Sequence, residues 1–182
     1  MTFERLDSAE IWSGKIASVR VDRFRYDDGD EAEREIVGHP GAVGVVAHDG
    51  EHLYLVEQPR EPVGEQALLE LPAGKLDEEG EGPLETAKRE LAEEIGKGAR
   101  EWRHLTTFWG SPGFSNEEVH VYLATGLYDD SAEAEENERI EVRKVPLAAL
   151  DELIRECRDA KTLVGLLWLK AFEQGERTAH EP

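Results

Sequence analysis

The sequence predicts an α/β fold: an α/β/α sandwich with a mixed sheet, plus a small N-terminal β subdomain. Short apolar runs typical of buried strands stand on both sides of an amphipathic helix, and a largely apolar helical segment follows the last of them. A length of 182 residues favours one compact domain with a core, or one domain with an appendage. We divide the chain into N-terminal strands (1–38), a main domain (39–175) and a frayed tail (176–182).

The N-terminal half reads as strands. Residues from Ile11 to Tyr26 alternate loosely between apolar and polar side chains, and a charged turn or loop is expected from Asp27 to Glu35. Two apolar runs, Ala42 to Ala47 and His52 to Val56, predict buried strands. Because Asp49-Gly50 between them favours a tight turn, these two strands should form a hairpin.

A helix from Pro83 to Ile95 is predicted with both of its ends. Pro83 lacks an N–H group that the first turn of a helix would leave unpaired, and Gly96 can adopt the left-handed conformation that closes a helix. Apolar residues recur between them at spacings of three and four, which predicts one stripe facing a core. The stripe consists of Leu84, Ala87, Leu91 and Ile95.

The C-terminal half alternates strands and helices. Strands are expected at His104 to Phe108, Val119 to Ala124 and Ile140 to Val145, with an acidic loop from Asp129 to Glu138. Helices are expected at Leu147 to Arg158 and Thr162 to Gln174. The second helix is apolar on most sides and Gly165 permits close approach, so it should pack in the core. Its core candidates are Leu163, Val164, Leu166, Leu167, Trp168 and Leu169.

Composition excludes several classes of protein. The formal charge of −20 comes from 41 Asp and Glu against 21 Lys and Arg, and such a surface repels nucleic acid and anionic membranes. The single cysteine, Cys157, excludes an intramolecular disulfide framework and fits a reducing compartment. The N-terminus has no apolar run typical of a secretory signal, and the apolar stretch from Thr162 to Phe172 is too short to span a bilayer. A soluble, cytoplasmic protein is expected.

The acidic excess also suggests a hypothesis about the solvent in which the protein works. At high salt, screening reduces the repulsion among the many carboxylates, so the composition would suit a saline interior. The melting temperature should then rise from low to molar KCl. A flat or falling melting temperature would exclude this adaptation.

The predicted helix gathers carboxylates on one face. Glu90 and Glu94 stand four residues apart beside the apolar stripe, where like charges repel by about 0.2–0.5 kcal/mol. Arg89 can neutralise Glu93 at the same spacing but is expected to point away from Glu90 and Glu94. Clustered oxygen ligands without a Cys or His pair favour a hard divalent cation such as Mg²⁺, which commonly also binds substrate phosphate. A simpler interpretation is a solvated acidic helix surface.

The same segment resembles a known motif, the Nudix box. The matching residues are Gly74, Glu81, Arg89-Glu90-Leu91, Glu93-Glu94 and Gly96. Two departures are visible. Six residues instead of five separate Gly74 from Glu81, which affects the loop that carries Glu81, and Lys97 replaces the final aliphatic residue.

The likeness extends along most of the chain, from about residue 11 to residue 172. Glu57 to Arg60, Glu70 to Gly74 and Ser111 to Glu118 resemble segments of the ADP-ribose pyrophosphatase branch of the Nudix superfamily. The resemblance implies Mg²⁺-dependent cleavage of ADP-ribose to AMP and ribose 5-phosphate, with Mn²⁺ as a substitute metal. The implied metal ligands are Glu90, Glu94, the carbonyl of Ala73 and, as a further or alternative ligand, Glu93.

The resemblance also implies other site residues. The family's general base matches Glu117, on a loop that Pro112 and Gly113 separate from the preceding strand. Glu118 is the alternative base and a substrate-binding candidate, and Glu93 could also activate water. Arg89 belongs to the implied catalytic set. Arg60, at a predicted strand end, and Glu70 are the other substrate-binding candidates, and a guanidinium suits a phosphate.

The resembled branch forms homodimers with exchanged N-terminal strands. Apolar N-terminal residues would then line the interface or an adenine pocket; these are Ile11, Trp12, Ile16, Val19, Val21 and Phe24. They could equally complete the sheet of a single subunit. Other substrates remain open, namely GDP-mannose, NADH and diadenosine polyphosphates, because the motif recognises the diphosphate and not the attached group. A non-catalytic ADP-ribose sensor is the alternative outside enzymes.

Overall fold

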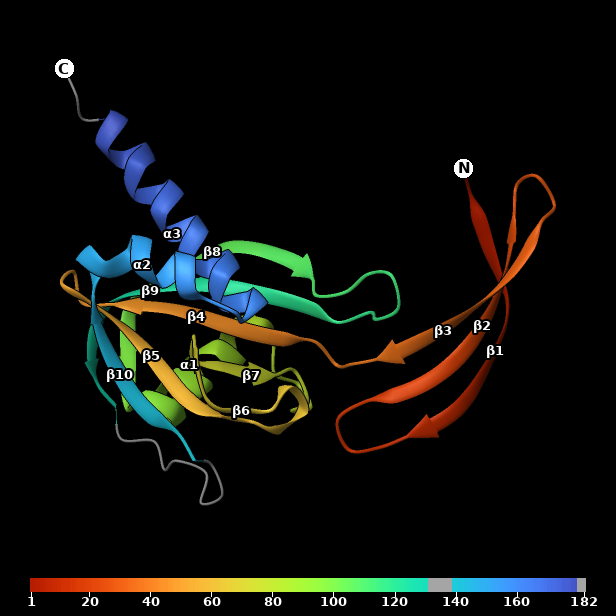
Figure 1. Ribbon diagram of the computed structural model, residues 1–182, viewed down its shortest axis with the longest axis horizontal. Helices are drawn as coiled ribbons and strands as arrows, with labels where there is room; N and C mark the ends of the chain where they lie inside the picture. The colour runs from red at the N-terminus through yellow and green to blue at the C-terminus, as the bar shows by residue number, and fades with distance from the viewer. Residues whose placement is uncertain (131–138, 180–182) are drawn as a thin grey trace. The chain divides into compact units, whose positions relative to one another are not determined.

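A computed structural model describes residues 1–130 and 139–179, with side chains described up to Phe172 (Figure 1). The strands are β1 (Phe3–Ser13), β2 (Ser18–Tyr26), β3 (Glu31–Gly38), β4 (Ala42–His48), β5 (His52–Arg60), β6 (Glu65–Glu70), β7 (Ala73–Lys75), β8 (Lys97–Trp109), β9 (Glu118–Asp129) and β10 (Glu141–Pro146). The helices are α1 (Pro83–Ile95), α2 (Leu150–Glu156) and α3 (Ala160–Ala179), with 3₁₀ turns at Glu61–Val63 and Leu147–Ala149.

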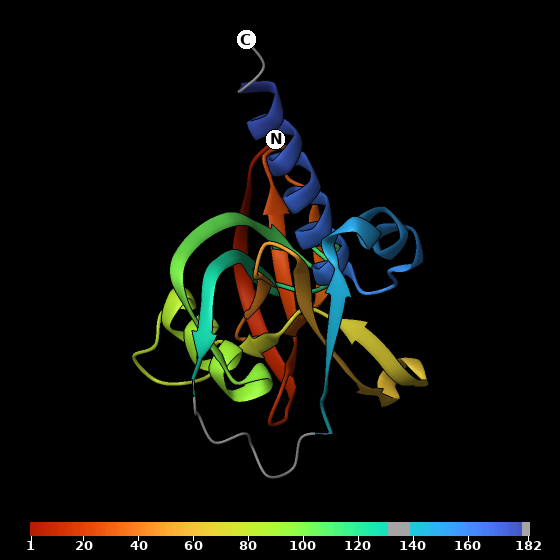
Figure 2. The same ribbon diagram turned by 90° about the vertical axis from the view of Figure 1, so that its left-hand side faces the viewer.

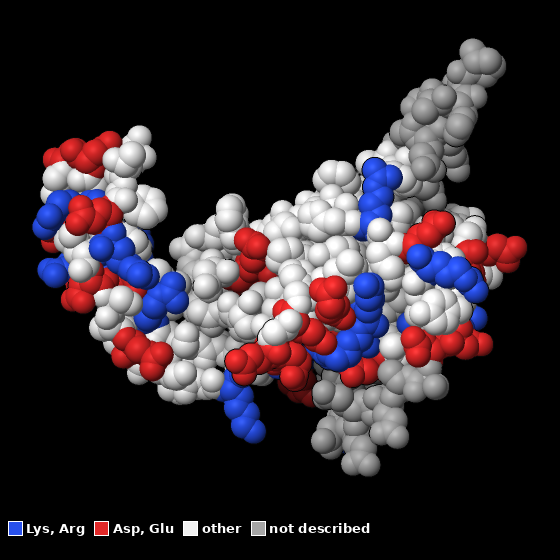
Figure 3. Space-filling model, turned by 180° about the vertical axis from the view of Figure 1, so that it is seen from behind, with Lys and Arg blue, Asp and Glu red and all other residues white. Residues whose placement is uncertain are grey.

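The chain forms two compact units. The first consists of Met1–Gly41 together with Phe108–Glu118, and the second of Ala42–Thr107 and Val119–Pro182. The first unit therefore contains a segment distant in sequence from the N-terminal strands. Acidic and basic side chains are intermixed on the surface of each unit (Figure 3).

The first unit is built on a three-stranded antiparallel sheet in the order β1-β2-β3. Its buried carboxylate, Asp22, accepts a hydrogen bond of 2.7 Å from Ser8 and one of 3.2 Å from Nε of Arg20. The segment from Asp27 to Glu35, expected as a turn or loop, is a turn only to Asp30 and then becomes β3. Its charged residues are compatible with a strand because a three-stranded sheet leaves many side chains exposed to solvent.

The second unit contains a mixed sheet in the order β10-β5-β4-β9-β8, with β6 on β5 and β7 on β4. Strands β4 and β9 are parallel, whereas β4 pairs with β5 and with β7 in antiparallel fashion. The predicted hairpin of Ala42–Ala47 and His52–Val56 is therefore confirmed. The short strands β6 and β7 were not predicted.

Strand β4 shows why this unit has two helical layers. Val43 and Val45 are fully buried in a core shared with Leu91 of α1, while Val46 faces the opposite side, toward Gly165 of α3. Successive side chains of a strand point to opposite faces, so a strand that is apolar on every residue needs cover on both. Helix α1 covers one face and α3 the other (Figure 2). The predicted α/β/α sandwich with a mixed sheet and a small N-terminal β unit is confirmed.

Helix α3 packs on the sheet with one stripe only. Leu166 and Leu169 are each 1% exposed, whereas Leu167 and Trp168 are each 46% exposed, so the prediction that all six apolar residues are core is wrong for these two. A β-carbon on Gly165 would lie 2.7 Å from Cδ1 of Leu71, which confirms the predicted close approach. Apolar composition alone did not reveal which face of the helix meets the sheet.

Several element boundaries differ from the expectations. The helix expected from Leu147 to Arg158 is a 3₁₀ turn followed by α2, and α3 begins before Thr162 and runs to Ala179. Of the acidic loop expected from Asp129 to Glu138, residues 131–138 lie outside the described part of the chain, as do residues 180–182 of the expected tail.

Candidate active site

Helix α1 begins and ends where its sequence predicts. Gly82 is the N-cap, Pro83 is the first helical residue, and Gly96 closes the helix with φ of 65°. The amide of Gly96 donates 3.0 Å to the carbonyl of Ala92. Because Leu91 and Ile95 are buried against the sheet, the opposite shoulder of the helix presents its carboxylates beside β7.

One arginine neutralises three carboxylates of this region. Nη1 of Arg89 lies 2.8 Å from Oε1 of Glu90 and 2.8 Å from Oε2 of Glu93, and Nε lies 3.2 Å from Glu81. Burial alone would lower the pKa of Arg89, but Glu90, Glu93 and Glu81 outweigh it and raise the pKa. The expectation that Arg89 points away from Glu90 is wrong, because its long side chain curls back to its sequence neighbour.

The extra residue in the loop before α1 does not separate Glu81 from the helix. The amide of Glu81 donates to the carbonyl of Glu78, which forms a turn containing Gly80 at φ of 86°. The turn leaves the Glu81 carboxylate 3.1 Å from the hydroxyl of Thr86, which donates to it, in addition to the contact with Arg89. Glu81 thus orients Arg89.

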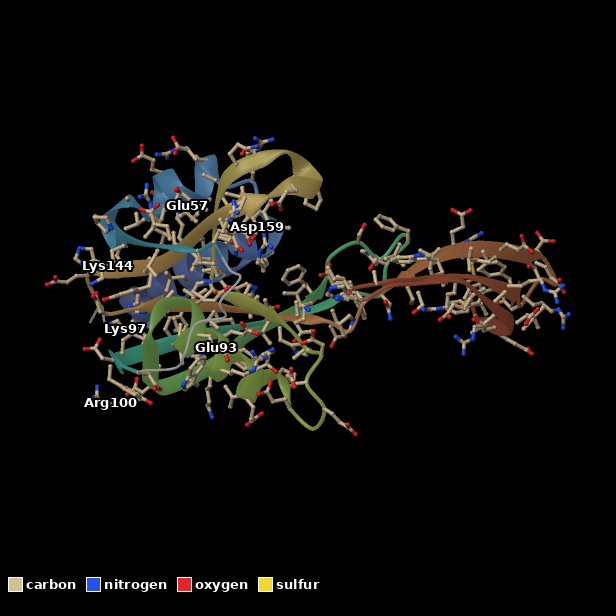
Figure 4. The ribbon with its side chains drawn as sticks, turned by 90° about the horizontal axis from the view of Figure 1, so that it is seen from below. Glu57, Glu93, Lys97, Arg100, Lys144 and Asp159 are labelled. Atoms are coloured by element: carbon tan, nitrogen blue, oxygen red, sulfur yellow. The ribbon has the colours of Figure 1, made fainter. Side chains whose placement is uncertain are left out.

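Two glutamates of α1 contact the β7 backbone. Glu94 is 8% exposed, and its Oε2 accepts a hydrogen bond of 2.9 Å from the amide of Ala73. A β-carbon on Gly74 would lie only 1.9 Å from Oε1 of Glu90. Residue 74 must therefore be glycine for Glu90 to keep its place. Glu93 is the more accessible neighbour on the same helix (Figure 4).

These residues form an oxygen-rich region with an excess of negative charge. Three carboxylates, those of Glu81, Glu90 and Glu93, share the guanidinium of Arg89, and a fourth, that of Glu94, accepts from the amide of Ala73. Among the described residues, no three His, Cys, Asp or Glu side chains converge as a metal-binding group, and Arg89 lies between Glu90 and Glu93. The donor set fits a hard cation, because it offers only carboxylate and backbone oxygen and because the glycine at 74 leaves room for the Glu90 carboxylate.

A second charged cluster joins the ends of β5 and β6 to the start of α3. Glu70 is 1% exposed and receives two parallel hydrogen bonds from Arg60, of 2.7 and 2.8 Å. Nζ of Lys161 donates 2.5 Å to Oε2 of the same carboxylate. Burial alone would raise the pKa of Glu70, but the hydrogen bonds and charges of Arg60 and Lys161 outweigh it and lower the pKa.

Residue Asp159 fixes the first turn of α3 beside this cluster. Its Oδ2 accepts hydrogen bonds from the amide of Thr162 at 2.9 Å, from the Thr162 hydroxyl at 2.6 Å and from Lys161 at 3.0 Å. The Thr162 hydroxyl oxygen in turn accepts 2.9 Å from the amide of Leu71. Helix α3 is thereby attached to the connection between β6 and β7.

The predicted base Glu117 belongs to the first unit. Its amide donates 3.1 Å to Oγ of Ser115, and its Oε1 lies 3.7 Å from Nδ1 of His39. The loop is attached to the end of β3: the amide of Val37 donates 2.7 Å to Phe114, and Asn116 donates 3.2 Å back to Val37. Glu118, the alternative base, begins β9 and has its own contacts.

The first unit also contains a cavity of about 310 Å³ between its sheet and this loop. Aromatic and cationic side chains line it together, among them Phe24, Tyr26, Arg20 and Arg34. Phe3 stands edge-on to Phe24 with 5.4 Å between ring centroids. Of the predicted N-terminal apolar residues, Ile11, Trp12 and Ile16 are 65%, 56% and 61% exposed.

Sequence reasoning did not find Lys161, Asp159, Thr162 or His39. The pattern Asp159-Ala-Lys-Thr162 before an apolar helix is a recognisable N-cap signal and could have placed the start of α3. No sequence signal pairs Lys161 with Glu70, which is 91 residues away. His39 likewise meets Glu117 only through the fold.

No helix in residues 1–130 and 139–179 combines the length and apolar character needed to cross a membrane.

Comparison with known proteins agrees with the geometry. The NUDIX domain family matches residues 38–164. An ADP-ribose pyrophosphatase of Bacillus subtilis is 42% identical over 169 residues, 90% of either chain, and a methanol dehydrogenase activator of Bacillus methanolicus is 38% identical over 173 residues, 92% of either chain. A crystal structure of an ADP compounds hydrolase, 24% identical, superposes with a TM-score of 0.85 and covers 97% of this chain and 96% of its own, which shows a shared fold.

Proposed function

Because the chain belongs to the NUDIX domain family and is an enzyme of it, a Nudix hydrolase, we propose that it hydrolyses the diphosphate of ADP-ribose to AMP and ribose 5-phosphate. The observation that carries this proposal is the charge-unbalanced carboxylate group of α1 beside Ala73 and Gly74. The 42% identity with an ADP-ribose pyrophosphatase supports the choice of substrate.

The α1 carboxylates would hold Mg²⁺, or Mn²⁺ in its place. Glu90, Glu94 and the carbonyl of Ala73 are the proposed ligands, with Glu93 a further or alternative one. When bound, the cation supplies charge stabilisation and polarisation of the phosphoryl oxygens. Arg89 would remain on Glu81 and release Glu90 and Glu93 to the cation, since its contact with Glu81 uses Nε and not Nη1.

The remaining steps are assigned to protein side chains. Glu117 would accept the proton of the attacking water, since a carboxylate 35% exposed can reach a water molecule. Arg60 would hold a substrate phosphate, because Glu70 uses its Nε and one hydrogen of Nη2 and leaves the other N–H groups for an anion. Glu118 and, through its hold on Arg60, Glu70 complete the proposed substrate-binding set.

The first unit would supply adenine binding and the dimer contact. The aromatic and arginine lining of its cavity suits a flat, polar base, and Phe24 is part of that lining. The exposed Ile11, Trp12 and Ile16 suit a contact with a second copy of the chain. We expect a homodimer by light scattering, and a monomer at micromolar concentration would refute the dimer. One cysteine and the nucleotide substrate are consistent with the cytoplasm.

The decisive experiment is a substrate panel. ADP-ribose, GDP-mannose, NADH and diadenosine polyphosphates are each incubated with the enzyme and Mg²⁺ or Mn²⁺, and released AMP, GMP or phosphate is quantified with and without a chelator. ADP-ribose should give the highest kcat/KM, and Glu94→Gln should abolish most turnover. Preference for another member of the panel would reassign the substrate. Binding of ADP-ribose without turnover would favour a sensor.

Normal turnover in the Glu94→Gln variant would refute the ligand assignment. Glu85→Gln is the matched control, because Glu85 stands in the first turn of the same helix and belongs to no proposed ligand set. It should keep the wild-type rate.

A further inference from the structure

In the cluster of Arg60, Glu70, Lys161 and Asp159, the more buried side chains are arranged to position the more exposed one, Arg60. The Glu70 carboxylate is 1% exposed and accepts three hydrogen bonds, two from Arg60 and one from Lys161. Because this carboxylate is buried and both of its oxygens accept hydrogen bonds, neither oxygen is accessible to a substrate. Glu70 therefore acts on a substrate through the cations that it holds.

The two cations differ in what they offer to solvent. The Arg60 side chain is 39% exposed and that of Lys161 only 17%. Arg60 donates to Glu70 through Nε and Nη2, whereas Nζ of Lys161 donates to both Glu70 and Asp159. Arg60 is therefore the more accessible cation of the cluster, and Lys161 the more buried one.

Charge within the cluster is balanced by Lys161. Glu70 and Asp159 contribute two negative charges, and Arg60 and Lys161 two positive ones. The hydrogen bond with Glu70 is the main cause that raises the pKa of Arg60, and the charges of Glu94 and Asp159 raise it further. Without Lys161, Glu70 and Asp159 would exceed Arg60 by one charge, in addition to the charge of Glu94, and the field at Arg60 would disfavour an anion.

The position of Lys161 is set by the N-cap of α3. Asp159 accepts hydrogen bonds from Lys161 and from the amide of Thr162, so the first helical turn holds the ammonium group against Glu70. The Thr162 hydroxyl also receives the amide of Leu71, the residue after Glu70. The carboxylate is thus fixed from two sides by the same turn.

We propose that Lys161 is a positioning residue for substrate binding: by sharing Glu70 with Arg60 and balancing Asp159, it keeps the Arg60 guanidinium oriented, with its free N–H groups available to a substrate phosphate. This inference rests on the proposed function for the identity of the anion. Its geometric part, the dependence of Arg60 on Lys161, does not depend on any substrate.

Steady-state kinetics can test the inference, with the substrate that the panel identifies. Lys161→Met keeps the aliphatic stem but removes the charge, and it should raise KM about tenfold with kcat within about threefold, the change expected for one lost charged hydrogen bond. Lys161→Arg should restore KM to within about threefold. Lys170→Met is the control, because Lys170 lies on the same helix and pairs with Asp151 at the surface.

A double variant separates positioning from a general effect on the fold. If Lys161 acts through Arg60, then Arg60→Ala/Lys161→Met should have the same KM as Arg60→Ala, because the second change removes nothing further. Multiplied KM effects would show that Lys161 acts independently of Arg60 and would overturn the inference. An unchanged KM in Lys161→Met, with the expected defect in Arg60→Ala, would overturn it as well.

The geometric part has a readout without substrate. The Arg60 Nε–H resonance in a ¹⁵N-¹H spectrum can be assigned by its absence in Arg60→Lys. It should shift and lose heteronuclear NOE intensity in Lys161→Met but not in Lys170→Met, because Glu70 loses one of the bonds that fix it. An unaltered resonance would refute the inference. Failure of the proposed function would appear separately, as wild-type protein that hydrolyses no member of the panel.

Discussion

Two groups of carboxylates in the second unit differ in how their charge is compensated. On α1 and in the loop before it, Glu81, Glu90 and Glu93 share the cation Arg89, and Glu94 accepts a hydrogen bond from a backbone amide. Around Glu70, two carboxylates meet two cations. An excess of partly buried carboxylates is costly unless a further cation joins, whereas a balanced cluster is complete without a ligand.

The difference suggests separate tasks. The unbalanced group on α1 suits a cation from solution, and the balanced group suits a fixed guanidinium whose free side meets an anion. A diphosphate substrate with its metal needs both. Substitutions on α1 should therefore lower activity and leave stability nearly unchanged. Substitutions around Glu70 should lower stability and raise KM.

The largest expected effect concerns a carboxylate outside both groups. In the proposed function this carboxylate is Glu117, the general base. Glu117→Gln should lower kcat about 10²- to 10⁴-fold, the usual contribution of a general base. Single-turnover rates at saturating substrate measure the effect. Glu85→Gln again serves as control, and a loss below tenfold in Glu117→Gln would transfer the role to Glu118 or Glu93.

A substitution at Gly74 of β7 should displace a carboxylate of the unbalanced group on α1. A β-carbon at Gly74 would lie 1.9 Å from Oε1 and 2.4 Å from Cγ of Glu90, so Gly74→Ala must displace the whole carboxylate arm. We expect kcat to fall about 10²-fold, as for a lost electrostatic contact in the transition state. Gly44→Ala is the control. Gly44 lies on β4, the strand paired with β7, and its added carbon would lie at an ordinary contact distance of 3.7 Å from Leu71. Equal rates for the two variants would contradict the prediction.

The balanced group should respond in stability. Glu70→Gln leaves Arg60 and Lys161 without their shared negative charge, and the free energy of unfolding should fall by about 2 kcal/mol, less than for a fully buried pair because Arg60 is 39% exposed. Glu90→Gln removes one charge from an excess and should change stability by less than about 0.5 kcal/mol. Urea titrations of both variants give the comparison, and a larger loss in Glu90→Gln would reverse it.

Asp49, a reference carboxylate that is stabilised mainly by amides, should show a smaller loss of stability than Glu70. Hydrogen bonds from the amides of Glu51 and His52 lower the pKa of Asp49 from its ordinary 3.8 to about 2. Because the folded pKa is the lower one, this stabilisation is present above about pH 4 and is lost as the pH falls toward 2. Asp49→Asn should cost about 1 kcal/mol at pH 7, a value reduced for the 34% exposure of the side chain, and almost nothing once the pH is well below about 2. A pH-independent difference between the two proteins would contradict the assigned cause.

The sequence by itself determined the features that depend on local chemistry. Pro83 and Gly96 fixed the ends of α1, the spacing of Leu91 and Ile95 fixed its buried face, and the segment from Gly74 to Gly96 identified the carboxylates. Runs such as Ala42 to Ala47 indicated buried strands. Each of these signals comes from residues that lie close together in the sequence.

The tertiary structure decided the contacts between distant residues. It brought Lys161 to Glu70, Thr162 to Leu71 and His39 to Glu117, and it turned Arg89 back toward Glu90. It also selected which side of α3 is buried and made a strand of Glu31–Gly38. The physical reason for the first group is that a long, flexible cationic side chain meets its partner only once the strands and helices have packed. The burial of a strand, in turn, depends on its neighbours in the sheet.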